Sequence, residues 1–584
     1  MKKRYKLLSS ILPVVALSPL ATTIASCSKD EYDSIAKQWK DEAIDKFINI
    51  VCPVHRPTFH TKAIQDTLVK YLQQHGYEVT IGTKYTEGDP KDGGQNIFFD
   101  IPATAGYENA PMAALQGHMD MVCMGTCTKD GVGVEPVIDG DYIHSKDWQS
   151  SLGADNGIGV GIILALAAKP NMIPHPKLRI FITTDEEDGN GGANTIWDEE
   201  TDWLAENPSD PNSRKVKHFF NIDQELVDTI TVACGGVRQA EICTIKNGEN
   251  VPGIKITPQP LKKGEYYQYQ FNIEGLMGLH SADAYKVHST SALKVMADLG
   301  LAICYIDSNA QLIMAVSDPY FEEDPAGGKW ISQGSGGTVA KSCRMILKTE
   351  LDPSSINDIV ELKLDDYKKS FPEEKDLKIK HFQLLFPYEY AIDSATTYKL
   401  LQLIWSLPFD VIQRYKDSEI PLTAMNIGPL VIPPCESEKE ITATLEIFGR
   451  SFREENLDEN DGIIMKAVRN VLQNIFLDNN IDFDPSIGYC CAWDIEDQQS
   501  KVNKLIHEAA DKFGYEMKDI YELGWLESAA FKHLDKVKHG DKAEMEVTSI
   551  GPLVEHYHET KERVKISSIT KLLKMLIYSL ERIK

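Results

Sequence analysis

The chain has 584 residues, of which 42% are hydrophobic and 25% charged, a composition that excludes a disordered or collagen-like protein. Its formal net charge of −26 argues against electrostatic binding to nucleic acid or to an anionic lipid surface. The length predicts more than one domain, and the excess of carboxylates suits a protein that binds cations.

Residues 1–26 have the pattern of a bacterial secretion signal. The opening MKKRYK is basic, and the apolar run over residues 7–24 is interrupted by Pro13 and Pro19. The run ends in IASC, which resembles a lipoprotein box and implies cleavage before Cys27 and a lipid on its thiol. We therefore expect a lipid-anchored protein on the extracytoplasmic face of the cell membrane. An ordinary signal followed by an unrelated cysteine, or an uncleaved anchor, are the alternatives.

The first part of the chain alternates between helical and strand patterns. The polar stretch SKDEYDS after Cys27 reads as a short linker. We then expect helices at 34–51, 62–75 and 155–168, and strands at 77–82, 96–103, 111–117, 178–184 and 218–222. Such alternation predicts an α/β domain with a mostly parallel sheet.

The pattern changes from about residue 241. A strand at 268–275, a helix near 285–303 and a strand at 311–317 predict a second α/β unit, which a strand at 442–451 and a helix at 461–477 repeat. Helices at 501–513 and 566–582 follow in a segment without a core of its own. The prediction is an α/β domain split between residues 27–240 and 485–584, with an α+β domain, 241–484, inserted into it.

The cysteines show no paired zinc-binding spacing. Cys123 and Cys127 are four residues apart but lack a matching second pair. A secreted chain could use its cysteines in disulfides, whereas their apolar surroundings favour buried free thiols.

Acidic and imidazole side chains recur in five segments. These are QGHMDM with His118 and Asp120, LGADNG with Asp155, TTDEEDG with Asp185–Asp188, NIDQE with Asp223 and Glu225, and EHYHETKER with His556 and His558. Each alone could be a structural hydrogen bond, a helix cap or a solvated loop. Because most follow apolar strands, whose carboxyl ends meet at one edge of a parallel sheet, the set together predicts a metal site. Clustered carboxylates without cations would be costly.

The ordered motifs QGHMDM, LGADNG, TTDEEDGNGGA, NIDQE, EGLMGLHS and HETKERV resemble those of the di-zinc exopeptidases. The resemblance covers nearly all of residues 35–584 and is greatest to the aminoacyl-histidine (Xaa-His, or cytosol non-specific) dipeptidases. It implies a zinc-exopeptidase-like catalytic domain with an inserted lid, and hydrolysis of dipeptides of Xaa-His type or of broad specificity. Small peptides would be the partners, and the resemblance is compatible with a homodimer.

The resemblance also assigns the metal ligands. His118 and Asp223 would bind one ion, Glu187 and His558 the other, and Asp155 would bridge the two. Carboxylate and imidazole ligands suit two Zn²⁺ ions, with Mn²⁺ or Co²⁺ as alternatives.

Three further residues would serve catalysis. The resemblance implies that Glu186 is the general base and acid that handles the proton of a metal-activated water. Asp120 would orient the imidazole of His118. His280 would stabilise the tetrahedral oxyanion, although Leu279 stands where relatives have a second glycine. A bystander acid at Glu186 and a helix-capping histidine at His280 are the alternatives.

Substrate contacts are expected from the inserted domain and from the last part of the chain. Asn426 and Arg450 match positions that resemble contacts to the peptide carboxylate, with an exposed polar pair as the alternative. Glu527 lies in ELGWLESAAF, where Leu523 replaces a histidine of the relatives. This departure puts the substrate preference in doubt more than the metal site.

Two other function classes stay open from the sequence. The same metal centre could serve an N-acyl amino acid deacylase or a carboxypeptidase. The chain could also be a non-enzymatic surface lipoprotein that binds peptides, although the retained acidic and imidazole residues argue against this.

Overall fold

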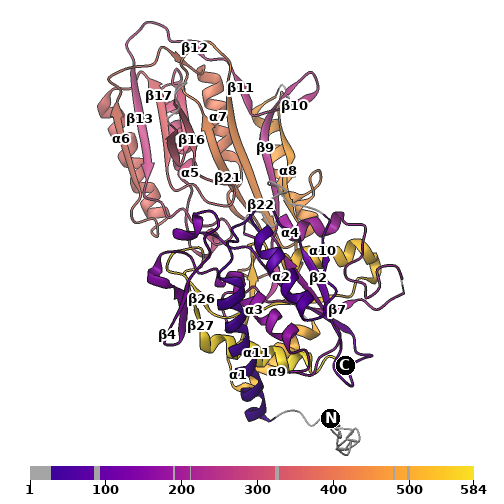
Figure 1. Cartoon of the computed structure of the whole chain (residues 1–584). Helices are drawn as coiled ribbons and strands as arrows, with labels where there is room; N and C mark the ends of the chain where they lie inside the picture. Colours follow the sequence, from indigo (N-terminus) through magenta and orange to yellow (C-terminus); the bar gives the residue numbers. More distant parts are fainter. Residues whose placement is uncertain are drawn as a thin grey trace, which may run out of the picture.

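The computed structural model describes residues 28–83, 93–187, 191–210, 212–322, 328–477, 480–495 and 500–584. The expected signal, 1–26, and the expected lipidation site, Cys27, lie outside these ranges. The chain forms two lobes, and both the first and the last helices lie in the same one (Figure 1). The other lobe contains the middle of the chain.

The first lobe is built on an eight-stranded sheet with the order β1-β2-β6-β3-β7-β25-β8-β24. Its strands are β1 Thr80–Ile81, β2 Ile97–Ile101, β3 Met112–His118, β6 Leu178–Thr183, β7 Val216–Asn221, β8 Thr229–Cys234, β24 Lys518–Glu522 and β25 Glu546–Ser549. Four neighbouring pairs are parallel, β3 with β6, β3 with β7, β7 with β25, and β8 with β24. The predicted mixed α/β fold with a mostly parallel sheet is confirmed.

The end of the chain completes this sheet. Strand β25 lies between β7 and β8, and β24 forms the edge beyond β8. The helices of this lobe are α1 Lys29–Lys46, α2 Lys62–Gln74, α3 Ala154–Ala168, α4 Gly191–Thr195, α9 Lys501–Phe513, α10 Glu527–His539 and α11 Ile566–Leu580. Side chains of α1, α3, α9 and α11 share one hydrophobic core. The last segment therefore packs on the first lobe.

Helix α1 begins earlier than the sequence patterns predicted. The stretch expected to be a linker is its first turn, because Ser28 and Glu31 form a capping box. The Ser28 hydroxyl accepts a hydrogen bond from the Glu31 amide at 3.3 Å, and the Glu31 carboxylate accepts one from the Ser28 amide at 2.6 Å. Polarity alone suggested a loop, whereas a polar first turn with a cap satisfies the free amides of a helix start.

Helix α3 lies in the interior, between the sheet and α1. All its residues from Ala154 to Ala167 are buried. A Cβ at Gly161 would lie 2.6 Å from the Ala43 carbonyl oxygen of α1, so glycine permits the close approach of the two helices. Trp39 of α1 donates its indole N–H to the Ile162 carbonyl at 3.0 Å. These contacts fix the helix whose N-terminal end carries Asp155.

A smaller four-stranded sheet with the order β26-β27-β5-β4 borders the first lobe. Its strands are β4 Pro136–Asp139, β5 Tyr142–Ser145, β26 Val554–Glu555 and β27 Arg563–Lys565. The turn between β26 and β27 carries His558.

The second lobe contains an eleven-stranded sheet whose main path is β10-β9-β22-β21-β14-β17-β13-β18. Its strands are β9 Gly236–Lys246, β10 Glu249–Pro252, β11 Ile254–Ile256, β13 Tyr267–Glu274, β14 Gln311–Ser317, β17 Cys343–Thr349, β18 Lys378–Gln383, β20 Asp410–Arg414, β21 Pro421–Ile432, β22 Ile441–Ser451 and β23 Ile481–Cys490. These strands pair with their neighbours in antiparallel directions. Two short ladders accompany it, β12 Gln259–Pro260 with β19 Tyr390–Ala391, and β15 Pro319–Glu322 with β16 Lys329–Ser332. Its helices are α5 Ala292–Ile306, α6 Pro353–Ser370, α7 Ser394–Ser406 and α8 Ile463–Ile475.

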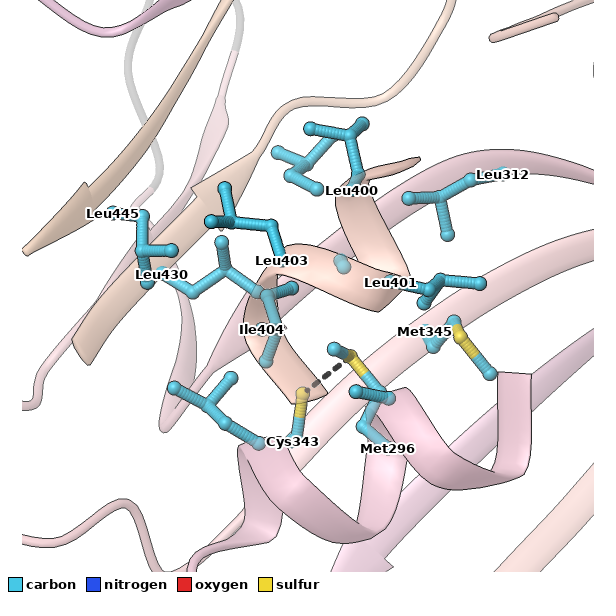
Figure 2. Close-up of a cluster of buried hydrophobic side chains, with 14 of the residues drawn as sticks. Met296, Leu312, Cys343, Met345, Leu400, Leu401, Leu403, Ile404, Leu430 and Leu445 are labelled. Atoms are coloured by element: carbon cyan, nitrogen blue, oxygen red, sulfur yellow. Dashed lines mark hydrogen bonds between the residues drawn. The ribbon is translucent and has the colours of Figure 1, made fainter. Parts of the chain in front are cut away.

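The core of the second lobe lies where α5 and α7 meet the sheet. Figure 2 shows Leu400, Leu401 and Leu403 of α7 among side chains of neighbouring elements, with the Cys343 thiol 3.2 Å from the Met296 sulfur. Helix α5 begins at Ala292 and not near 285, because the Ser291 hydroxyl caps it by accepting from the Leu293 amide. The residues before it form a loop around His280.

The ten cysteines of the described ranges are all free thiols, and most are buried. Among the residues placed by the structure, none of the helices combines the length and the apolar character needed to cross a membrane.

Candidate metal centre

Parallel strands bring four of the expected ligands to one edge of the first sheet. His118 is the last residue of β3, Glu187 follows β6, and Asp223 follows β7. Asp155 stands in the first turn of α3 at the same edge. The carboxyl ends of neighbouring parallel strands are the usual place for a ligand site in such sheets, which explains the convergence.

The carboxylate of Asp155 connects two pairs of side chains. Its Oδ1 lies 3.2 Å from His118 Nε2, which in turn lies 3.3 Å from Asp223 Oδ1. Its Oδ2 lies 3.5 Å from His558 Nε2, which lies 2.7 Å from Glu187 Oε2. Ligand atoms of His118, Asp155 and Glu187 all lie within 4.8 Å of one another. The structure thus brings together two donor sets that share one carboxylate.

The electrostatics of the cluster fit bound cations. Burial, together with the Asp155 carboxylate, raises the pKa of Glu187 to about 7. Burial and the Asp155 carboxylate also raise the pKa of Asp223 to about 6, although His118 acts to lower it. Burial would lower the pKa of His118, but the surrounding carboxylates, Asp223 first, hold it well above its ordinary value. Within the described ranges, the buried Glu187 Oε1 has no hydrogen-bond partner. Buried carboxylates in excess of cationic groups are costly, and divalent cations would balance them.

Asp120 organises three parts of the site. Its Oδ1 lies 3.2 Å from His118 Nδ1 and accepts the Glu186 amide at 3.0 Å. Its Oδ2 accepts the Glu187 amide at 3.2 Å and the Thr58 hydroxyl at 3.0 Å. Burial would raise the pKa of Asp120, but these hydrogen bonds, from His118 first, lower it. A carboxylate behind a ligating histidine fixes the orientation of its ring.

The Glu186 side chain lies beside the candidate metal ligands. Its Oε2 is 4.0 Å from His118 Nε2, and its side chain is 15% exposed. Burial, followed by the charges of Asp223 and Glu187, raises its pKa well above the ordinary value. A carboxyl with a raised pKa can both accept and return a proton near neutral pH.

His558 reaches the cluster from the turn between β26 and β27. Its backbone has φ 62°, a left-handed conformation that is strained for a non-glycine residue and that clusters at functional sites. Its ring is 41% exposed, whereas the neighbouring His556 contacts Glu559 and takes no part in the cluster. Burial would lower the pKa of His558, but Asp155 and Glu187 raise it to about 11.

A second cluster in the other lobe contains His280, Asn426 and Arg450. Arg450 Nη2 lies 3.3 Å from His280 Nε2, and since a guanidinium can only donate, this imidazole nitrogen accepts. Asn426, 2% exposed, donates to the Gly336 and Thr338 carbonyls at 2.9 and 2.8 Å. Asn426 and Arg450 are therefore both buried and do not form an exposed polar pair.

Arg450 is a buried cation that is only 5% exposed. Its other hydrogen bonds go to the Ser281 hydroxyl at 2.9 Å and to the Leu523 carbonyl at 3.3 Å. None of the described residues gives it an ion-pair partner. Such a guanidinium can bind a carboxylate with little loss of water.

Glu527 lies beneath the metal centre and is fully buried. Its carboxyl accepts from the Gln116 amide and, at 2.7 Å, from the Thr183 hydroxyl. Burial raises its pKa to about 8, with the charges of His118 and Asp223 as the next largest influences. Glu527 therefore contacts β3 and β6, the strands that lead to His118 and Glu187. Because Leu523 and Glu527 belong to one short segment, this segment connects the metal centre to the second cluster.

Arg56 was not identified from the sequence. It is 1% exposed and donates to the Met119 and Asp120 carbonyls at 3.0 and 2.7 Å, and also to the Gly153 carbonyl. It therefore holds the end of β3 against the start of α3. No motif marks it, because its partners are backbone groups that are far away in the sequence.

A cavity of about 660 Å³ opens beside Glu187. His55 and residues 57–60 line it, together with residues 121–123, Thr128 and Asp130. The candidate metal centre therefore borders this cavity on the side of Glu187.

No family model matches the chain. It is homologous to the cytosol non-specific dipeptidase of Escherichia coli (strain K12), with 27% identity over 252 residues. This alignment spans 42% of the chain and 44% of the relative, which is less than half of either protein.

The fold matches that of a solved aminoacylhistidine dipeptidase from Vibrio alginolyticus. The TM-score is 0.69 at 19% sequence identity, over 93% of this chain and 96% of the other. The two-lobed architecture is therefore shared over nearly the whole length.

Proposed function

We propose that the protein is a metal-dependent dipeptidase. The observation that carries this proposal is the position of Asp155, whose two carboxylate oxygens face two separate histidine–carboxylate pairs. Homology to a cytosol non-specific dipeptidase supports the choice of substrate class.

His118, Asp223 and Asp155 would hold one divalent cation, and Glu187, His558 and Asp155 the other. Three protein ligands to each ion leave coordination positions open, as in catalytic rather than structural zinc sites. Bound there, the ions would supply Lewis acidity that polarises the scissile carbonyl and acidifies water. Mixed imidazole and carboxylate donors favour Zn²⁺, with Mn²⁺ and Co²⁺ as the alternatives.

Glu186 is the proposed proton carrier. Its carboxylate lies at the edge of the ligand cluster, and its raised pKa lets it accept a proton from the attacking water and return it to the leaving amine. Asp120 holds the Glu186 amide and the His118 ring with the same oxygen, so the proton carrier and one ligand share a support.

The second lobe would bind the other end of the substrate. Arg450 provides the positive charge for the C-terminal carboxylate of a dipeptide, and the neighbouring His280 provides a polar group for the reacting carbonyl. Asn426 fixes the 336–338 loop around them. The cavity beside Glu187 would take a side chain of the substrate.

Glu186→Gln tests this assignment. The variant should retain both metal ions, since Glu186 is not a ligand, and lose about 10²- to 10⁴-fold in kcat, the usual contribution of a general base. Metal content by mass spectrometry and hydrolysis of unblocked dipeptides are the measurements. Full activity, or loss of metal together with activity, would contradict the role of Glu186.

A substrate panel tests the reaction class. Unblocked dipeptides, C-terminally amidated dipeptides and N-acyl amino acids are compared with the wild-type protein. We expect hydrolysis of the unblocked dipeptides and not of the amidated ones, because Arg450 needs a free carboxylate. N-acyl amino acids keep this carboxylate but lack the free amino group, so they separate a dipeptidase from a deacylase. Preference for N-acyl amino acids would indicate a deacylase.

We further propose that the mature protein is anchored by a lipid on Cys27. The support is the lipobox-like IASC sequence at the end of the apolar run. In the producing bacterium, the wild-type protein should partition into detergent, and a Cys27→Ser variant should not. Equal partition of the two proteins would contradict the proposal.

A further inference from the structure

Glu562 is a buried carboxylate that no catalytic assignment uses. It is 2% exposed and lies at the end of the turn that carries His558, directly before β27. Its two oxygens accept hydrogen bonds from four consecutive backbone amides: Oε2 from Leu152 at 2.8 Å and Gly153 at 2.9 Å, and Oε1 from Ala154 at 2.7 Å and Asp155 at 3.4 Å.

These amides form the start of α3, which has no cap of its own. The residue at the N-cap position is Gly153, which has no side chain to offer. The first amides of a helix need acceptors and favour a negative charge. Glu562 meets both needs from a segment about 400 residues away in sequence.

The conformation at Gly153 makes this support important. Its φ is +66°, and a Cβ there would lie 2.4 Å from the Arg56 guanidinium and 2.7 Å from the Met121 sulfur. Arg56 donates to the Gly153 carbonyl while Glu562 accepts from the Gly153 amide. Two side chains thus hold the peptide groups on both sides of the residue that leads into Asp155.

Glu562 also fixes the segment of His558. His558 has a left-handed backbone, which persists only when surrounding contacts determine it. Glu562 stands four residues later in the same turn and anchors it to α3. The carboxylate therefore sets the distance between the turn with one ligand and the helix start with the bridging ligand.

We propose that Glu562 is a positioning residue for the metal centre: it holds His558 and Asp155 in register so that both can contact one ion. This inference rests on the proposed function for the identity of the ligands. A purely structural cap would stabilise α3 without affecting metal affinity, so the two roles differ in a measurable way.

The test compares Glu562→Gln with Glu199→Gln. Glutamine keeps the shape of Glu562 but has only one acceptor oxygen and directs N–H groups at the amides. Glu199 is the matched control, because it is also buried, at 3%, and accepts a backbone amide, that of Thr83, at 2.9 Å, but contacts no ligand. The readouts are the Zn²⁺ dissociation constants by competition with a chromogenic chelator, and the rise in Tm on adding Zn²⁺.

We expect Glu562→Gln to bind the more weakly held Zn²⁺ at least about tenfold less tightly, as for other groups that orient metal ligands. Its metal-induced rise in Tm should shrink accordingly, because a ligand stabilises the folded state according to its affinity. Glu199→Gln should lower the Tm of the metal-free protein and leave both dissociation constants unchanged.

A folded Glu562→Gln variant with unchanged Zn²⁺ affinity would overturn the inference. If this variant does not fold, Glu562→Asp, which keeps the charge but shortens the reach, is judged by the same criterion. A wild-type protein that binds Zn²⁺ but hydrolyses no dipeptide would refute the proposed function and leave the role of Glu562 intact. A wild-type protein that binds no divalent metal would refute both.

Discussion

At the residue scale, the candidate metal ligands are easier to recognise in the sequence than the residues that hold them in place. His118, Asp155 and Asp223 follow or precede strongly apolar segments, so their convergence could be predicted from the behaviour of parallel strands. Arg56 contacts backbone carbonyls and Glu562 contacts backbone amides, and these groups are present whatever the side chains are. Their roles depend on which distant segments the fold brings together, which no local pattern encodes.

The raised pKa of Glu527 explains why this fully buried acid is tolerated in the fold. Its pKa of about 8 means that the folded protein keeps it protonated at neutral pH, whereas the unfolded chain ionises it at its ordinary value. Folding therefore takes up a proton between these two values, and this group's contribution to stability falls as the pH rises through that window.

Glu527→Gln should remove this pH dependence in the metal-free protein. Glutamine imitates the protonated acid, so the variant's free energy of unfolding should decline less than that of the wild type from about pH 5 to pH 8. The free energy of unfolding at each pH is measured by urea unfolding in the presence of a chelator, with Glu199→Gln as the control. Parallel pH profiles for Glu527→Gln and the wild type would show that Glu527 is ionised in the folded state.

At the element scale, the sequence patterns located most helices and strands, but errors fell where a cap decides the boundary. Helix α1 starts at Lys29 and α5 at Ala292 because Ser28 and Ser291 accept amide hydrogen bonds there. Apolar periodicity locates the middle of a helix, whereas its first turn is polar and resembles a loop.

The loop before α5 has a support comparable to Glu562. Glu374, 1% exposed, accepts the Met277 amide at 2.9 Å and the Thr290 amide at 3.3 Å. It thus joins the two ends of the segment that carries His280. The segment contains a short 3-10 helix, Ala284–Lys286, and this carboxylate holds the backbone on both sides of it.

Glu374→Gln should therefore lower kcat while leaving the metal content unchanged. Loss of one buried acceptor costs about 1–3 kcal/mol of stability, and misplacement of His280 adds a kinetic defect that stability alone does not explain. Asp307→Asn is the control, because Asp307 holds the Thr349 hydroxyl and the Glu350 amide at the opposite end of α5. Equal kcat values for the two folded variants would contradict the role of Glu374.

At the scale of the whole molecule, the two lobes meet around Leu523. A small hydrophobic cluster combines Leu523 and Ala233 of the first lobe with Ala282, Leu422 and Phe452 of the second. The Leu523 carbonyl accepts from Arg450, and Glu522 lies 3.8 Å from Lys286 of the second lobe. The sequence does not indicate the surface between the lobes, because its residues come from several separate segments.

This contact gives a physical reading of the leucine found where the resemblance places a histidine. Leu523 is fully buried among apolar side chains, so a histidine there would have to lose its hydration. The position therefore contributes to the junction between the lobes, and its backbone carbonyl accepts a hydrogen bond from Arg450.

Leu523→Ala should weaken the junction and the activity together. Removing a fully buried leucine side chain costs about 2–5 kcal/mol, and here the cavity would lie between the lobes, next to Arg450. Leu401→Ala, in the core of the second lobe (Figure 2), is the matched control, because Leu401 is equally buried but belongs to a different hydrophobic cluster from Leu523. Both variants should lose stability in urea unfolding, yet only Leu523→Ala should raise KM for dipeptides, since Arg450 loses a fixed position relative to the metal centre. Equal KM values in the two folded variants would show that the lobes are held together by other contacts.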